Sequence, residues 1–251
     1  MNLKKTIISI ITVSYNVVDT IEETILSVIS QDFDSYEYII IDGGSQDGTL
    51  DIIKKYEDKI TLWVSEPDKG IYDAMNKGVL LAKGEWVNFM NAGDLFVNDI
   101  SVLLNEVLVD NNHDVIYGDV LIKKNGIVSL DKAREIQQLN YSLNFCHQSS
   151  FVRREILIKS PFSLNYKISS DYNLFLNLFI KGYNFYYIKS PISIFEYGGI
   201  SSGASKKYIK ERFAIITNSH NGIKDKFWFS YKFVKMLIPL NRATLVKFFK
   251  N

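Results

Sequence analysis

Apolar runs and helical repeats alternate along the first hundred residues of the chain. Four runs rich in β-branched residues read as strands, at positions 6–14, 36–42, 60–66 and 85–91. Between them, apolar residues recur every three to four positions, which predicts helices over 19–31, 47–58 and 70–84. Strands that are apolar throughout are buried on both faces. The pattern therefore predicts an α/β fold with a mostly parallel central sheet and helices on both of its faces.

The alternation becomes less regular after residue 98. We expect a helix over 99–112, one or two strands over 114–130 and a strong helix over 170–183, whereas residues 131–150 show no clear pattern. A strand interrupted at Pro191 and a last helix near 205–219 complete the prediction.

These elements group into one α/β domain over 1–223 and a tail. The domain divides into a nucleotide-binding half, 1–100, and an acceptor-binding half, 101–223, and the helical tail covers 224–251.

The charge is unevenly distributed. The 251 residues carry a net charge of +1, but residues 224–251 contain seven basic residues and one acidic residue, a net +6. The remainder is therefore acidic, at about −5, and we expect no nucleic-acid partner. A single cysteine, Cys146, excludes an internal disulfide and is expected to be a small buried residue.

The beginning of the chain has two lysines before an apolar run, as a signal peptide would. The run is short and ends in Ser14-Tyr15-Asn16 without a small-residue cleavage site, so a buried strand is the better interpretation. No segment reaches the roughly 20 apolar residues of a membrane span. The expected location is the cytoplasm.

Polar residues follow three of the predicted strands where each strand ends. They are Asp42, Glu66, Asp68, Asn91 and Asp94. The carboxyl ends of parallel strands meet at one edge of a sheet, where open α/β sheets bind ligands. Any single one of these acids could instead cap a helix. The segment "DGGSQDGT" lacks both the dinucleotide and the P-loop signatures, so a dinucleotide or ATP site is poorly supported.

A metal at Asp94 requires an anionic ligand beside it. Mg²⁺ and Mn²⁺ prefer about six oxygen ligands, and one carboxylate on a short turn supplies too few. A nucleotide diphosphate would supply the missing oxygens, and Gly93 gives the turn the freedom to aim Asp94 at such a ligand.

Three ordered segments resemble the family 2 glycosyltransferases, inverting enzymes of GT-A fold that build bacterial surface polysaccharides. They are "SIITVSYNVVDTIEETILSVISQ", "IIIDGGSQDGTLDII" and "SEPDKGIYDAMNKGVLLAKGEWVNFMNAGD". The resemblance is close over residues 6–100 and weaker to about 200. It implies a GT-A, Rossmann-like fold, a UDP-sugar as donor of a hexose or N-acetylhexosamine, a divalent cation (Mn²⁺ or Mg²⁺) and a glycan acceptor, lipid-linked, for capsule, O-antigen or exopolysaccharide.

The resemblance also implies roles for particular residues. Those assigned to the nucleotide sugar are Thr12, Tyr15, Asp42, Glu66, Asp68 and Asn91. Asp94 would be the direct metal ligand, and Asp171 in "SSDYNLFL" would be the general base that accepts the proton of the acceptor hydroxyl. Those assigned to the acceptor or to a closing loop are His147, Gln148 and Gly199. His147 is the rival candidate for the base.

Four positions depart from the family pattern. Gly43 replaces a second acid, Met75 stands where many members have arginine, Asn91 replaces the first acid of D-x-D, and Ser170 replaces the glutamate before the catalytic aspartate. Asn91 can still accept and donate hydrogen bonds but brings no charge, so we expect weaker metal binding without nucleotide.

Two other functions remain open at this point. An inactive nucleotide-binding module would explain Asn91, although the retained Asp94 and Asp171 oppose it. A nucleotidyltransferase would need a basic phosphate loop after the first strand, and "TVSYNVVDT" has none.

The tail mixes lysines with aromatic residues at helical spacing. This composition fits a helix lying on an anionic membrane, on the inner face of the cell membrane. The alternative is a helix packed on the body of the protein or on a second subunit, as in a homodimer.

Overall fold

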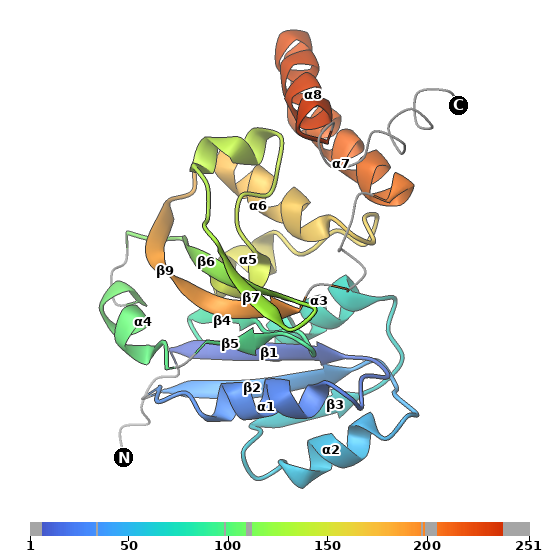
Figure 1. Ribbon diagram of the computed structural model, residues 1–251, viewed down its shortest axis with the longest axis vertical. Coiled ribbons are helices and arrows are strands. Elements are labelled where there is room, and N and C mark those ends of the chain that lie inside the picture. The colour runs from blue at the N-terminus through green and yellow to red at the C-terminus, as the bar shows by residue number, and fades with distance from the viewer. Residues whose placement is uncertain are drawn as a thin grey trace.

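The computed structural model describes residues 7–33, 35–97, 99–108, 112–196, 198 and 205–237. A sheet of nine strands, in the order β3-β2-β1-β4-β8-β6-β9-β5 with β7 paired to β6, forms the centre of this part of the chain (Figure 1). The predicted fold class, an α/β sheet with helices around it, is confirmed.

The first half of the chain forms the parallel part of the sheet. Its strands are β1 (Ile8–Ser14), β2 (Tyr36–Asp42), β3 (Leu62–Ser65) and β4 (Trp86–Phe89). The helices that connect them are α1 (Ile21–Ile29), α2 (Thr49–Lys55) and α3 (Ile71–Leu81). Strand β1 lies between β2 and β4 and pairs in parallel with both. The expected order of strands and helices is confirmed here.

Strand β1 buries both of its faces, as its apolar run predicts. Ile11 and Val13 pack with α3 on one side, and Ile8 and Ile10 pack with α1 on the other. All seven residues of β1 are buried. The sheet is therefore covered on both faces around β1, which leaves the end of this strand for a site.

The second half of the chain adds a more mixed arrangement. Its elements are β5 (Leu95–Phe96), α4 (Ser101–Leu108), β6 (Val115–Lys124), β7 (Ile127–Asp131), the 3₁₀ helices η1 (Ile136–Asn140) and η2 (His147–Ser149), β8 (Ser150–Arg153), α5 (Arg154–Lys159), α6 (Ser170–Ile180) and β9 (Phe185–Glu196). Strand β8 joins the two halves, because it pairs antiparallel with both β4 and β6.

The expected strand break at Pro191 takes another form. Strand β9 continues through this position, and the β6–β9 register shifts on both sides of Asp119, which pairs with Pro191. Proline has no N–H to donate to the ladder, so the irregularity appears in the pairing and the strand itself does not end.

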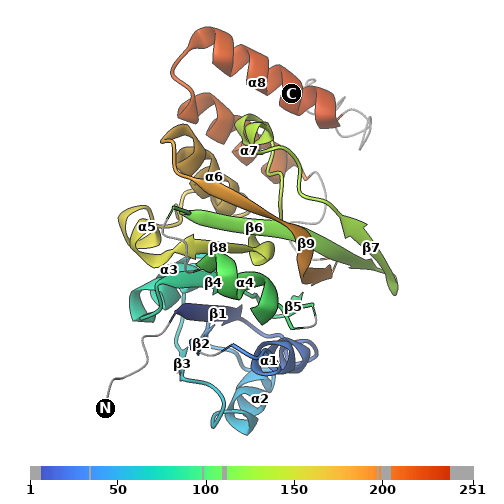
Figure 2. The ribbon, with the colours of Figure 1, turned by 90° about the vertical axis from the view of Figure 1, so that its left-hand side faces the viewer.

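Two helices close the described chain, α7 (Lys206–Ser219) and α8 (Ile223–Leu237). Figure 2 shows both beyond α6, on the side of the molecule away from β1 and β2. The predicted last helix and the start of the helical tail are confirmed, and residues 238–251 of the tail lie outside the described residues. Within the described part, no helix is both long and apolar enough to cross a membrane.

Candidate active site

A cavity of about 830 Å³ opens at the carboxyl ends of β1 and β4. Its walls come from segments far apart in the sequence: the end of β1, the start of α3, the turn 91–94, residues 143–148 around η2, the start of α6, and α7. Asn91, Asp94, His147, Gln148 and Asp171 all line it. The strand-end crevice expected from the sequence is therefore present, and it reaches into the second half of the chain.

Asp42, at the end of β2, is fully buried and does not line the cavity. Its carboxylate accepts hydrogen bonds from the backbone of Gly44 and Ser45 and from the hydroxyls of Ser14, Ser45 and Ser65, at 2.5–3.0 Å. Burial alone would raise the pKa of Asp42, but these hydrogen bonds outweigh it and hold the pKa below its usual value. Asp42 thus organises the loop after β2.

Thr12 and Glu66 also lie away from the cavity lining. Thr12 is buried inside the sheet, with its hydroxyl 3.0 Å from the hydroxyl of Tyr38. Glu66 is exposed and forms an ion pair with Lys77 at 2.7 Å. Neither side chain is brought to the cavity with the other predicted sugar-donor residues.

Tyr15 and Asp68 do line the cavity, on either side of Gly43. A Cβ atom at position 43 would lie 2.7 Å from Asp68 Oδ2 and 3.2 Å from the Tyr15 ring. A side chain at position 43 would therefore require the Asp68 carboxylate to move aside. Met75, the second departure, is a residue of α3 and is fully buried in the core.

The turn that carries Asp94 is fastened to helix α1. Thr24 accepts a hydrogen bond from Gly93 N at 2.9 Å and donates one to Asp94 O at 3.0 Å. Gly93 has a φ of 100°, a conformation that residues with a Cβ rarely adopt. The turn therefore needs the backbone freedom expected of this glycine.

Asp94 is held by Gln148 of η2. Gln148 Nε2 donates to Asp94 Oδ2 at 2.5 Å, and Cys146 Sγ donates to Gln148 Oε1 at 2.6 Å, which orients the amide. Burial raises the pKa of Asp94 to about 6, even though Gln148 and the charge of His147 act against the rise. Cys146, expected only as a buried residue, thus has a polar contact at the cavity, and burial raises the pKa of its thiol.

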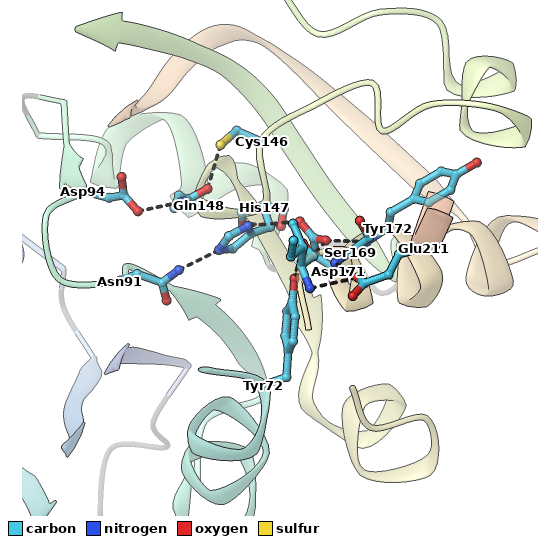
Figure 3. A network of polar contacts seen from close by, with 12 residues as sticks. Tyr72, Asn91, Asp94, Cys146, His147, Gln148, Ser169, Asp171, Tyr172 and Glu211 are labelled. Carbon is cyan, nitrogen blue, oxygen red and sulfur yellow. Dashed lines mark hydrogen bonds and ion pairs between the residues drawn. The ribbon is translucent and has the colours of Figure 1, made fainter. Parts of the chain in front are cut away.

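A second chain of contacts runs from Asn91 to Asp171 (Figure 3). Asn91 Nδ2 lies 2.9 Å from His147 Nε2, and His147 Nδ1 lies 3.4 Å from Asp171 Oδ2. The other carboxylate oxygen, Oδ1, accepts from Tyr72 Oη at 3.2 Å and from Tyr172 N at 2.8 Å. His147 and Gln148, predicted to touch the acceptor, therefore contact the predicted base, Asp171, and the predicted metal ligand, Asp94.

Asp171 stands in the first turn of α6, at the cavity wall. Burial would raise its pKa, but His147, the charge of Arg212 and the Tyr172 N–H lower it below the usual value. An ionised carboxylate at a cavity wall is the state that a general base requires.

Helix α7 supports this end of the cavity. Glu211 accepts hydrogen bonds from the backbone N–H groups of Lys167, Ile168 and Ser169, at 2.9–3.0 Å, just before α6 (Figure 3). Arg212 is buried, and its guanidinium lies 4.1 Å from the centre of the Tyr172 ring.

Several functional positions were not expected from the sequence. Tyr72 lies within "GIYDAM", which the family resemblance covers, but Arg212 lies beyond that resemblance in an ordinary helix and carried no signal. Gly199, the predicted loop residue, lies outside the described residues, whereas its neighbour Gly198 lines the cavity.

The residues present supply one carboxylate for a divalent cation. In the described part of the chain, no group of three or more histidine, cysteine or acidic residues is placed to hold a metal. Asp94 is buried at the cavity wall with one strong amide contact, and Asn91 Oδ1 is a buried oxygen without a hydrogen-bond partner among the described residues. This set fits a metal only if substrate oxygens complete the coordination.

The fold and the site define an α/β protein with a strand-end cavity that has one acid on the strand-end turn and another on a different wall. The profile of Glycosyl transferase family 2 matches residues 9–172. The "PGL/p-HBAD biosynthesis glycosyltransferase" of Mycobacterium bovis is 30% identical over 177 residues, which cover 68% of this chain and 69% of that protein. The chain belongs to glycosyl transferase family 2 and is a glycosyltransferase.

Two solved structures share the fold at low identity. S. aureus TarS 1–349 in complex with UDP-GlcNAc matches 95% of this chain and 74% of its own, with a TM-score of 0.71 and 20% identity. The mannosyltransferase PcManGT of Pyrobaculum calidifontis in complex with GDP-Man and Mn²⁺ matches 94% and 75%, with a TM-score of 0.60 and 16% identity. The predicted GT-A type of fold is confirmed.

Proposed function

We propose that this glycosyltransferase transfers a hexose or N-acetylhexosamine from a UDP-sugar to a hydroxyl of a glycan, with inversion at the anomeric carbon. The observation that carries the proposal is the placement of Asp94 and Asp171 on different walls of one cavity. One acid stands where a diphosphate would lie and the other where an acceptor would lie. Bound UDP-GlcNAc in TarS and GDP-Man in PcManGT support a nucleotide-sugar donor.

Asp171 is the proposed base in a single displacement. The acceptor oxygen forms a bond to the anomeric carbon, the bond from that carbon to the diphosphate oxygen breaks with its electron pair, and the hydroxyl proton passes to Asp171. Among the described residues, Asp171 Oδ2 contacts only His147, and so it keeps the capacity to accept this proton.

Asp94 is the proposed ligand of a divalent cation, Mn²⁺ or Mg²⁺, together with the diphosphate oxygens of the substrate. When bound there, the cation would supply positive charge to the leaving diphosphate. Tyr15 and Asp68 are the proposed contacts of the nucleoside, because both line the cavity beside Gly43. The halves 1–100 and 101–223 then correspond to the sugar-donor and acceptor sides.

The proposed acceptor is a lipid-linked glycan of a bacterial surface polysaccharide such as capsule, O-antigen or exopolysaccharide, used at the cytoplasmic face of the membrane. Helix α8 supports this proposal. Among its exposed residues are Ile223, Phe227, Trp228 and Tyr231. Lysines 224, 226, 232 and 235 of the same helix would face anionic lipid head groups.

The test is hydrolysis of a panel of nucleotide sugars, with and without Mn²⁺, by the wild type and by Asp171→Asn. The expected result is metal-dependent turnover of UDP-sugars that falls by about 10²–10⁴-fold in the variant, while the sugar donor still binds. Binding without turnover, even with lipid-linked acceptors present, would instead identify an inactive nucleotide-sugar-binding module.

A further inference from the structure

The contact between Asn91 and His147 constrains the proton of the imidazole. With the amide oriented as in the structure, Asn91 Nδ2 donates and His147 Nε2, 2.9 Å away, accepts. The proton of a neutral imidazole then lies on Nδ1, the atom that faces Asp171 Oδ2 at 3.4 Å. The reverse orientation of the amide would require an imidazolium with both nitrogens protonated, a form that the NMR test below distinguishes from this one.

We propose that Asn91 is a positioning residue for the catalytic base and acts through His147, whose tautomer it fixes so that Nδ1–H is directed at Asp171. The inference rests on the proposed function, because Asp171 is the base there. It gives the residue that replaces the first acid of the family pattern a role on the acceptor side of the cavity. His147 is then a positioning residue too, and not the base.

An aspartate at position 91 could not do the same. A carboxylate only accepts, so it would require a proton on His147 Nε2. The imidazole would then either turn an unprotonated Nδ1 toward Asp171 or become a cation between two carboxylates. In the first case Asp171 loses its hydrogen bond, and in the second it becomes a weaker base.

The side-chain oxygen of Asn91 remains available for a contact with the sugar donor. With its nitrogen on His147, its oxygen Oδ1 is buried and has no partner among the described residues. That oxygen can accept a hydrogen bond from a hydroxyl of the bound nucleotide sugar. One amide thus contacts both the sugar-donor side and the base.

The neighbouring ionisable groups are few. Tyr72 of α3 and Arg212 of α7 face Asp171, and Asp94 and Cys146 lie near His147 and Gln148. Among the described residues, none of these four groups contacts His147 Nε2. The effect of Asn91 on the tautomer can therefore be measured without a competing contact at that atom.

The first test is ¹⁵N NMR of histidine-labelled protein, which contains three histidines in all. The signal of His147, assigned by its loss in His147→Asn, is expected to show Nδ1–H in the wild type. In Asn91→Leu, which cannot donate, the Nε2–H form that free imidazole favours is expected to appear. An Nε2–H form or a doubly protonated imidazole in the wild type, or no change in Asn91→Leu, would overturn the inference. This readout does not depend on turnover.

The second test compares two amides at position 147 by sugar-nucleotide hydrolysis. Asparagine places its NH₂ where Nδ1 stands, and glutamine places its amide where Nε2 stands. His147→Gln is therefore expected to lose about 100-fold in kcat and to move the acidic limb of the pH profile upward, because Asp171 loses a donor. His147→Asn should keep kcat within about tenfold and leave the acidic limb near that of the wild type.

Thermal unfolding of both variants separates misfolding from loss of function. Equal losses in two folded variants, or a change confined to KM for the sugar donor, would contradict the inference. Absence of turnover in the wild type would instead refute the proposed function and leave the NMR result standing.

Asn91→Asp supplies a third measurement. We expect a lower kcat and an acidic limb moved to lower pH, because a cationic His147 would stabilise the ionised Asp171. If Asn91 served only the sugar donor, this substitution would alter KM and leave the acidic limb in place.

Discussion

At Asp94, the charge that metal binding requires lowers the stability of the folded protein. It is buried at the cavity wall, and its pKa of about 6 means that the folded protein resists its ionisation. A metal ligand must be ionised, so the fold keeps at this position a charge that it does not favour.

This opposition gives a stability prediction for Asp94→Asn. In the unfolded chain the carboxyl loses its proton near 3.8 and in the folded protein near 6, so the penalty develops as pH rises between these values. We expect the variant to gain about 1–3 kcal/mol in free energy of unfolding at pH 7 and less than about 0.2 kcal/mol at pH 3. The measurement is urea unfolding with a chelator present.

The exposed Asp58 is the matched control, because Asp58→Asn should change the unfolding free energy by less than about 0.5 kcal/mol. If Asp94→Asn were less stable than the wild type at pH 7, the account of Asp94 given above would be wrong.

At the scale of elements, the position of Asp171 depends on helix α7. Glu211 binds three consecutive backbone N–H groups immediately before α6, and Asp171 lies in the first turn of that helix. Glu211 contacts neither His147 nor Asp171 in the described structure, so its influence on the base would be exerted through the backbone.

We therefore expect Glu211→Ala to destabilise the protein by about 1–2 kcal/mol, because three backbone amides, two of them part-buried, lose their acceptor. We also expect kcat to fall while KM for the sugar donor stays near the wild-type value. Differential scanning calorimetry and sugar-nucleotide hydrolysis check the two effects. Glu155→Ala removes an exposed ion pair with Lys159 and should change neither. A normal kcat in Glu211→Ala would show that α7 does not position the base.

The sequence predicted the parallel half well, because its strands are continuous apolar runs and its turns carry the family segments. It predicted which acids lie at the strand ends but not which of them face the cavity. Asp42 is turned inward by hydroxyls from three different segments, and no local pattern encodes that. The pairing of His147 with Asp171 likewise depends on η2, in a segment without periodicity.

At the scale of the whole molecule, α8 presents an apolar face away from the cavity elements. Phe233 anchors the helix by packing fully buried against α6 and α7, whereas Ile223, Phe227 and Tyr231, spaced four residues apart, are exposed. The helix is thus attached by one face and free on another among the described residues.

A membrane role predicts that the full chain sediments with anionic vesicles and that the double variant Phe227→Ser, Tyr231→Ser does not. Leu80→Ser removes a similarly exposed apolar side chain from α3 and should sediment as the wild type does. Equal sedimentation of the double variant and the wild type would exclude this face as the membrane contact. A loss of dimerisation without any vesicle binding would assign it to a second subunit.

The short helix η2 has a consequence for changing what this enzyme accepts. Its adjacent residues His147 and Gln148 hold acids from two different walls, Asp171 and Asp94. Substitutions at these two positions that are meant to admit a new acceptor will therefore also alter use of the sugar donor. A gain in one property will be accompanied by a loss in the other. Asp131, the last residue of the exposed strand β7, lines the same cavity and, among the described residues, has no hydrogen bond to either acid, so variation there would avoid that coupling.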